Sequence, residues 1–89
     1  MKEIYFKPEK REKVLNERKI DMEIIAHMIK DWQFIRIMKV PSRPYQNMYV
    51  INYWWYACCV PFNENDDGIE LKTAYFSRKI NKFLNLNLG

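Results

Sequence analysis

Between residues 34 and 76 the chain contains four consecutive segments with the residue pattern of β-strands. Only a proline-containing loop, a two-residue link and a polar loop separate them. The predicted strands cover residues 34–40, 48–51, 54–60 and 69–76. Because short connections join strands that run in opposite directions, this arrangement predicts an antiparallel sheet. Any helices elsewhere in the chain then have a sheet to pack against.

The connections between these strands are predicted from their turn residues. Proline ends the first strand, so residues 41–44 are expected to form a loop. Asn52 and Tyr53 are expected to form the next turn, since asparagine tolerates positive φ, although tyrosine does so poorly. Pro61 is expected to end the third strand, before a polar loop over residues 63–68.

The N-terminal third is predicted to hold one short strand and two helices. An alternating pattern over residues 2–6 indicates the strand. Pro8 can open a charge-rich helix over residues 8–19, because its missing N–H is harmless in the first turn. Asp21 is a plausible N-cap for the second helix. Its apolar residues recur at helical spacing: Ile24, Ile25, Met28 and Trp32.

The end of the chain combines a strand-to-helix junction with positive charge. Ser77 is expected to cap a final helix that runs to about residue 84, with a frayed tail over residues 85–89. From Lys72 onward there are four cations and no acid. Free N–H groups and partial positive charge at a helix start favour a phosphate. The predicted order is therefore β-α-α-β-β-β-β-α, an α+β fold of two layers in a single domain.

The charges are distributed unevenly along the chain. Residues 1–19 hold seven Lys or Arg against four Glu, and residues 70–89 hold four against one acid. Residues 20–69 hold four cations against six acids. If the two termini converge in space, their cations form one electropositive face, which is typical of nucleic-acid binding.

The composition also argues against a disulfide, a metal site and a membrane segment. Cys58 and Cys59 are adjacent, so on a strand they point to opposite faces and cannot readily bridge. No CxxC pair or His/Cys cluster is present, and we expect neither a metal nor a cofactor. Two reduced thiols fit the cytoplasm. No stretch approaches about 18 apolar residues, so no membrane segment is expected.

Three stretches resemble the BrnT-type toxins, which belong to the RelE-like group of type II toxin–antitoxin ribonucleases. Residues 4–10, Ile-Tyr-Phe-Lys-Pro-Glu-Lys, resemble the opening strand and the start of the first helix. Residues 18–21, Arg-Lys-Ile-Asp, resemble the junction between the two helices. Residues 72–79, Lys-Thr-Ala-Tyr-Phe-Ser-Arg-Lys, resemble the closing block, and the order of elements agrees.

The resemblance implies a RelE-like fold and a toxin that inhibits translation by cleaving mRNA. Cleavage of this kind needs no metal: the 2′-OH attacks the adjacent phosphorus and leaves a 2′,3′-cyclic phosphate. The resemblance further implies a small antitoxin of the ribbon-helix-helix type as partner. Operator DNA would then be bound only through the complex with that antitoxin.

The positive charge at the end of the chain and the resemblance to BrnT-type toxins together indicate the candidate site residues. Arg78 is the first choice for the scissile phosphate, because its planar fork can engage two oxygens at once. The alternative is a surface arginine that caps the helix or pairs with an acid. The supporting catalytic candidates are Lys72, Lys79 and Lys82. The candidates for RNA contact are Arg43, Lys7, Lys10 and Tyr75.

Two further readings remain open. His27 is the only histidine, and it is either a general base or a structural residue of the second helix. The aromatic run at residues 53–56 either stacks RNA bases, binds the antitoxin or fills the core. Since no general base stands out, a non-catalytic domain that binds a partner or nucleic acid is the alternative function. The nuclease hypothesis predicts that Arg78 lines a cationic hollow shared with the lysines near the N-terminus.

Overall fold

The computed structural model of this protein describes residues 3–84 and confirms the α+β class and the predicted order of elements. The N-terminal part holds β1 (Glu3–Tyr5), α1 (Pro8–Arg18) and α2 (Met22–Lys30). The remaining elements are β2 (Arg36–Val40), β3 (Arg43–Tyr53), β4 (Tyr56–Glu64), β5 (Gly68–Leu71), β6 (Tyr75–Phe76) and α3 (Arg78–Leu84). The last predicted strand is thus divided into β5 and β6. The predicted frayed tail at residues 85–89 lies outside the described residues.

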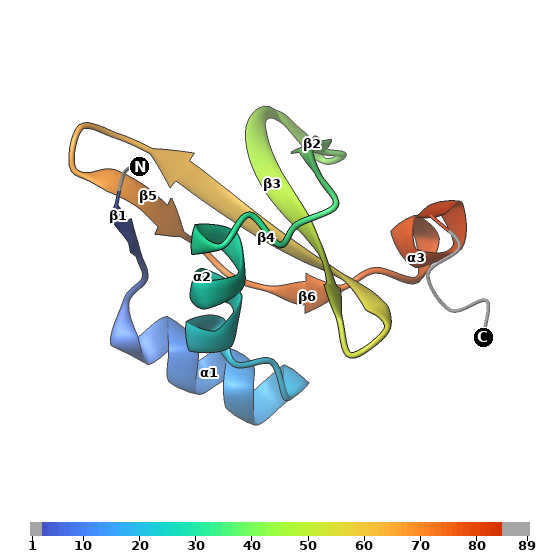
Figure 1. The fold of residues 1–89 in the computed structure, drawn as a ribbon, viewed down its shortest axis with the longest axis horizontal. Helices are drawn as coiled ribbons and strands as arrows, with labels where there is room; N and C mark the ends of the chain where they lie inside the picture. Colours follow the sequence, from blue (N-terminus) through green and yellow to red (C-terminus); the bar gives the residue numbers. More distant parts are fainter. Residues whose placement is uncertain (1–2, 85–89) are drawn as a thin grey trace.

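The strands form one sheet in the order β1-β5-β4-β3-β2, and β6 pairs with β4 beyond the end of β5 (Figure 1). The sequential strands are antiparallel, as predicted. β1 is the exception, because it lies parallel to β5, with Ile4 opposite Ile69. The connection from β1 to β5 contains both N-terminal helices and the strands β2, β3 and β4, which is long enough for parallel neighbours. This pairing brings the N-terminal segment beside the chain that leads into β6.

The sheet buries side chains on both faces. Tyr49, Ile51 and Cys58 belong to the core cluster that α1 and α2 cover. Val50, Cys59 and Ile80 belong to a second cluster, which α3 covers. The two cysteines therefore point to opposite faces, as predicted. α3 packs against the face of the sheet that carries this second cluster, and α1 and α2 cover the other face.

The loop between β2 and β3 is shorter than predicted. β3 begins at Arg43, which pairs with Val40, so only residues 41–42 form the turn and Arg43 is a strand residue. The register shifts at this point, because Val40 faces Arg43 while Lys39 faces Asn47. Pro44 lies within this irregularity, where a missing N–H removes no regular ladder bond.

The hairpin turn between β3 and β4 also differs from the prediction. Tyr53 pairs with Tyr56, so Trp54 and Trp55 form a two-residue turn with φ of 54° and 67°. Positive φ at both positions is typical of type I′ hairpins, which favour Asn-Gly. The side chain of Tyr53 is buried. Because burial of one face fixes the register of a strand, the buried Tyr53 sets the turn here rather than the preference of Asn52 for positive φ.

Pro61 does not end β4, which continues to Glu64. The carbonyl of Pro61 accepts a hydrogen bond from the N–H of Lys72 at 2.8 Å. In a strand, the N–H and C=O of one residue point to the same side. The missing donor of Pro61 therefore faces the gap between β5 and β6, where it breaks no regular pairing.

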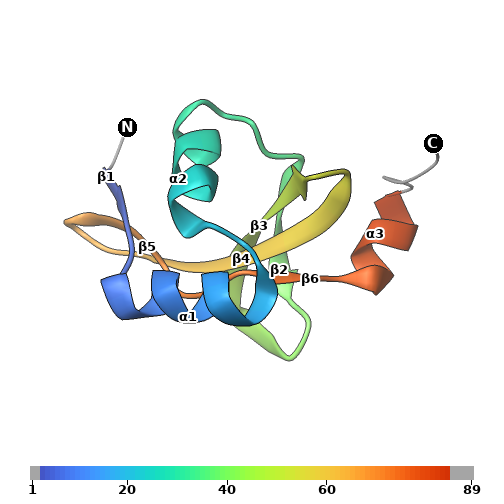
Figure 2. The ribbon, with the colours of Figure 1, turned by 90° about the horizontal axis from the view of Figure 1, so that it is seen from below.

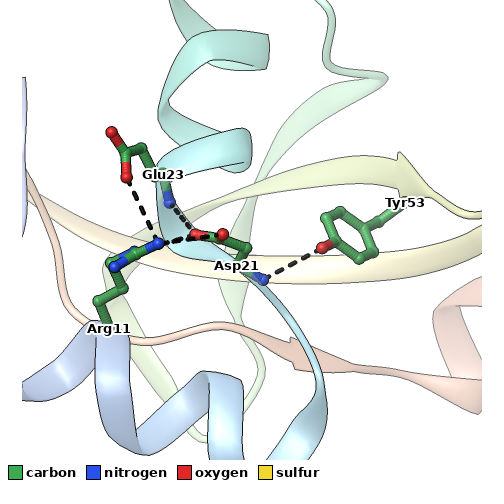
Figure 3. Close-up of polar contacts among 4 residues, drawn as sticks. All are labelled: Arg11, Asp21, Glu23 and Tyr53. Atoms are coloured by element: carbon green, nitrogen blue, oxygen red, sulfur yellow. Dashed lines mark hydrogen bonds and ion pairs between the residues drawn. The ribbon is translucent and has the colours of Figure 1, made fainter.

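The N-cap at Asp21 is confirmed, and it links three elements (Figure 3). Its carboxylate accepts from the N–H of Glu23 at 2.9 Å and from Nε and Nη2 of Arg11 at 3.1 and 3.2 Å. Its own N–H donates to the hydroxyl of Tyr53 at 3.1 Å. The hydrogen bond from Arg11 lowers the pKa of the Asp21 carboxyl below its ordinary value. This cluster fixes α1, the start of α2 and the end of β3 relative to one another.

The buried face of α2 is displaced from the predicted one. Ile25 is buried as expected, but the side chain of Ile24 is 45% exposed and that of Trp32 is 71% exposed. Trp32 follows the helix with a φ of 59°, so it no longer continues the helical face. The buried residues of this helix are Met22, Ile25, Ala26 and Ile29. Within residues 3–84, no helix is long and apolar enough to cross a membrane.

Candidate functional site

Basic side chains from three segments line one hollow of about 300 Å³, which we call the cationic hollow. α1 contributes one of its faces, β3 contributes its first residue, and the chain after β5 forms the remaining wall. The lining residues are Lys10, Lys13, Val14, Arg18, Arg43, Lys72 and Thr73. Five of these side chains are cationic and none is acidic. Such a concentration of one sign of charge attracts an anion.

Arg18 ties α1 to the opposite wall of this hollow. Its Nη1 donates to Oγ1 of Thr73 at 3.1 Å and to the carbonyl oxygen of Ala74 at 3.0 Å. Because a single nitrogen makes both bonds, the guanidinium keeps further N–H donors for a ligand. The parallel pairing of β1 with β5 makes this contact possible, since it places α1 beside the chain that follows β5.

The other cations of the hollow are compensated only in part. The ammonium of Lys72 lies 3.6 Å from the Glu70 carboxylate. Lys10, Lys13 and Arg43 have no ion-pair partner within residues 3–84. Like charges gathered without counter-charges repel one another, so an anion in the hollow would stabilise the fold as well as bind to it.

A second hollow of about 330 Å³ adjoins the first and shares Arg43, Lys72 and Thr73 with it. It adds neutral hydrogen-bonding groups from Ser42 and Tyr75. Burial raises the pKa of the Tyr75 phenol. Its hydroxyl lies 3.8 Å from Sδ of Met48, a weak acceptor. At neutral pH this hydroxyl therefore remains a hydrogen-bond donor.

The predicted site residues divide into two groups. Lys72, Arg43 and Lys10 come together in the cationic hollow, and Tyr75 lies in the hollow beside it. Lys7 caps the start of α1 with its backbone and is exposed, outside the lining of both hollows.

The predicted residues of α3 lie elsewhere. Arg78 lines a different hollow, together with the aromatic side chains of Tyr53, Trp54, Tyr56 and Phe76. Lys79 and Lys82 are exposed on the same short helix and line neither the cationic hollow nor the hollow beside it. The expectation that Arg78 shares a hollow with the N-terminal lysines is therefore wrong. Figures 1 and 2 give the reason, because α3 lies at one end of the long axis and away from α1.

The position of α3 follows from its contacts with β4. Ser77 caps the helix as predicted, since its Oγ accepts from the N–H of Ile80 at 3.2 Å. The N–H of Ser77 donates to the carbonyl of Ala57 at 3.0 Å. Oδ1 of the buried Asn81 accepts from the N–H of Ala57 at 2.9 Å. Both polar backbone groups of Ala57 are thus satisfied by the helix and its cap, which fixes α3 near the β3–β4 turn.

Sequence reasoning missed two residues of the cationic hollow, Lys13 and Arg18. The acids interleaved in the first helix suggest an ordinary solvated surface, which hides the contribution of this helix. A signal was nevertheless present. Lys10, Val14 and Arg18 recur at intervals of four residues, so they lie on one helical face. Arg11, one position away, pairs instead with Asp21.

The other reactive groups, which are one histidine and two cysteines, lie outside the cationic hollow and the hollow beside it. His27 is exposed on α2 and lines neither of them. Burial raises the pKa of Cys58 to about 12 and that of Cys59 to about 11, so both remain thiols at neutral pH. In the described part of the chain, His, Cys, Asp and Glu side chains form no group of three that could hold a metal.

The closest chemical description of the site is thus an anion-binding groove with neutral donors at one end. Comparison of the chain with models of known protein families, with curated proteins and with solved structures gives no match.

Proposed function

We propose that this protein binds single-stranded RNA at the cationic hollow and cleaves mRNA as a metal-independent endoribonuclease. In this proposal it is the toxin of a type II toxin–antitoxin system of the RelE-like kind. The observation that carries the proposal is the union of five cations from α1, β3 and the chain after β5 in one hollow without a lining acid. Phosphate contacts of this kind supply most of the affinity for nucleic acid. The likeness of residues 4–10, 18–21 and 72–79 to BrnT-type toxins adds support.

The proposed reaction is an internal transfer at phosphorus. The 2′-oxygen attacks the adjacent phosphorus, the bond from phosphorus to the 5′-oxygen breaks, and a 2′,3′-cyclic phosphate remains. The proton of the 2′-OH passes to solvent water, and the departing 5′-oxygen gains a proton from water or from the Tyr75 phenol. Negative charge gathers on the non-bridging oxygens in the transition state, where preorganised cations stabilise it most.

The residues of the hollow suit different parts of this task. The Arg18 guanidinium is held in place by Thr73 and Ala74 and presents its remaining donors as a preorganised group. Arg43 and Lys72 line both adjoining hollows. A phosphate at the boundary between the two hollows can therefore contact both of these cations. The protonated phenol of Tyr75 can donate a hydrogen bond, or a proton, to the departing 5′-oxygen.

The experiment that tests this function is an RNA cleavage assay in the presence of EDTA with protein free of any antitoxin. We expect cleavage of single-stranded RNA and 2′,3′-cyclic phosphate ends. Arg43→Ala should weaken RNA binding and reduce the slope of log K against log salt by about one, as loss of one phosphate contact does. Lys39→Ala is the matched control, because it removes an exposed cation of β2 outside the hollow.

Comparison of two arginines locates the scissile phosphate. Arg18→Lys keeps the charge but loses the further guanidinium N–H donors that remain for the phosphate once Nη1 has bonded Thr73 and Ala74, so cleavage should fall further than binding. Arg78→Ala should reduce cleavage less than Arg18→Lys does. If Arg78→Ala reduces cleavage more than Arg18→Lys does, the scissile phosphate lies at α3 and not at the cationic hollow. If the RNA stays intact at high protein concentration, the enzymatic proposal is wrong.

One observation favours a second candidate function, an RNA-binding domain without catalysis. The side chains that line the cationic hollow include no histidine and no carboxylate to accept the 2′-OH proton. A protein of this kind binds the same RNA with the same dependence on Arg43 and on salt, but it leaves the RNA intact.

A small ribbon-helix-helix antitoxin is the proposed partner, and operator DNA is bound only in its complex. A sheet edge that pairs with no other strand within residues 3–84 supports this part of the proposal. β2 lies at the end of the strand order, and Ile37 on it is 49% exposed. Beside it, an apolar hollow of about 270 Å³ includes Ile37, Phe34 and Trp32 among its lining residues. An added strand from a partner would pair with such an edge and bury these side chains.

A further inference from the structure

The hollow beside α3 is built almost entirely from aromatic rings. Tyr53, Trp54, Tyr56, Phe76 and Arg78 line a space of about 430 Å³ at the β3–β4 turn, which we call the aromatic hollow. Trp54 lies edge-on to Tyr53 with an interplanar angle of 86°, and Tyr56 lies edge-on to Phe76 at 88°. Since these rings are not stacked on one another, they form walls at an angle and leave room for a further flat group.

The tryptophan of this hollow is costly for the fold. Trp54 has a φ of 54°, and a residue other than glycine held in this region costs on the order of 1–3 kcal/mol. Trp54 is 78% exposed, so burial of its side chain offsets little of this conformational free energy. Asparagine would suit this turn position far better. Stability therefore gives no reason for tryptophan here, whereas a contact with a ligand does.

The single charged residue of the aromatic hollow selects among flat ligands. Arg78 has no ion-pair partner among residues 3–84, and α3 contains no acid in its described length. A ligand that satisfies both the rings and the guanidinium is planar on one side and anionic on the other. An unpaired nucleotide has this combination, because its base stacks on aromatic rings while its phosphate accepts from arginine.

The aromatic and cationic hollows lie along the same stretch of chain. Thr73 lines the cationic hollow, and Phe76 lines the aromatic one. Three residues of chain span at most about 11 Å even when fully extended. A short single strand of RNA therefore reaches from one hollow to the other.

We propose that the aromatic hollow is a base-binding subsite, in which one unpaired base of the bound RNA stacks on Trp54 and its phosphate meets Arg78. This inference rests on the proposed RNA binding at the cationic hollow. In this proposal the hairpin turn selects single-stranded RNA, because a base in a base pair cannot enter the aromatic hollow. Arg78 is then a binding residue for a neighbouring phosphate rather than for the scissile one.

The test uses short single-stranded oligonucleotides that cannot be cleaved. The first probe is a 2′-O-methyl RNA of mixed sequence, and the second is an abasic oligomer with the same number of phosphates. We expect Trp54→Asn to weaken binding of the RNA by about 5- to 150-fold, the effect of losing one base–aromatic stack. Binding of the abasic oligomer should not change.

Trp55→Asn is the matched control for this test. Trp55 has a φ of 67° and is 74% exposed in the same turn, but it does not line the aromatic hollow. Asparagine accepts positive φ, so both variants should fold at least as stably as the wild type. Trp55→Asn should bind both probes like the wild type.

The outcomes separate this inference from the proposed function. If Trp54→Asn binds the RNA like the wild type while Arg43→Ala binds it weakly, the base subsite is overturned and the RNA-binding function stands. If the wild type binds neither probe, both proposals are overturned. If Trp54→Asn retains RNA but loses a co-expressed antitoxin, the hollow is a protein-docking site and the inference is overturned.

Discussion

Nη1 of Arg18 donates both to Oγ1 of Thr73 and to the carbonyl of Ala74, at 3.1 and 3.0 Å. These bonds join the last turn of α1 to the chain between β5 and β6, across 55 and 56 residues of sequence. They close one side of the cationic hollow and orient the guanidinium that we place at the phosphate. Arg18 therefore both stabilises the contact between these two segments and, in the proposed function, binds the phosphate.

Arg18→Ala should lower the free energy of unfolding by about 1–2 kcal/mol, because it removes two hydrogen bonds with a charged donor that is largely exposed to solvent. Urea unfolding followed by circular dichroism measures this change. Glu17→Ala, at the neighbouring exposed position of α1, is the control and should change it by less than about 0.5 kcal/mol. Equal stability of both variants would mean that the Arg18 bonds contribute nothing in solution.

Gly68→Ala should disrupt the pairing of β1 with β5. Gly68 has a φ of 152°, and an added Cβ would lie 2.2 Å from the carbonyl oxygen of Glu3. Because that oxygen belongs to the backbone, β1 must move. We expect a loss of about 2–4 kcal/mol in unfolding free energy from strain and overpacking.

The same substitution should also weaken RNA binding, since this pairing places α1 at the cationic hollow. Asp67→Ala, at the exposed neighbouring position, is the control for both measurements. A Gly68→Ala protein with wild-type stability would contradict the observed register of β1.

Asn81→Ala should destabilise the docking of α3. The side chain of Asn81 is buried, and its Oδ1 accepts from the N–H of Ala57. Without it, a buried backbone donor lacks a partner, which costs about 1–3 kcal/mol. Thermal or urea unfolding measures the loss, and Lys82→Ala on the exposed side of α3 is the control. If Asn81→Ala and Lys82→Ala unfold together, α3 contributes no cooperative stability.

Stability should depend on pH through Asp21. The hydrogen bond from Arg11 lowers the pKa of this carboxyl from its ordinary value of 3.8. The folded state therefore binds this proton less readily than the unfolded state. The contribution of Asp21 is fully present above pH 3.8 and is lost as the pH falls through the lowered folded-state pKa.

Asp21→Asn tests this dependence, because asparagine still caps a helix but does not titrate. Unfolding curves from neutral pH down to strongly acidic pH should converge for the wild type and the variant as the pH falls. A constant difference between the two proteins across that range would exclude Asp21 as the titrating group.

Replacement of Trp54-Trp55 by Asn-Gly should raise the free energy of unfolding by about 1–3 kcal/mol. Both tryptophans have positive φ, and Asn-Gly is the preferred sequence of a type I′ turn. Urea midpoints of the wild type and the double variant measure the gain. Unchanged stability would show that contacts of the exposed rings compensate for the strain of the turn.

Local sequence signals determined a large part of this protein. The period of two in the strands, Pro8 and the caps at Asp21 and Ser77 predict the α+β class and the order of elements. Short-range physics is sufficient for these features, because each depends on residues within a few positions of one another. Opposite directions for Cys58 and Cys59 follow from the same periodicity.

Only the tertiary structure decided which charges meet. The parallel pairing of Ile4 with Ile69 carries α1 to the chain after β5, so Lys10 meets Lys72 and not Arg78. Burial of Tyr53 moves the hairpin turn onto two tryptophans and thereby builds the aromatic hollow around Arg78. Both outcomes depend on contacts between residues far apart in sequence. Turn preferences and runs of charge contain no information about such contacts, because the burial of a whole sheet face outweighs the preference of any single turn.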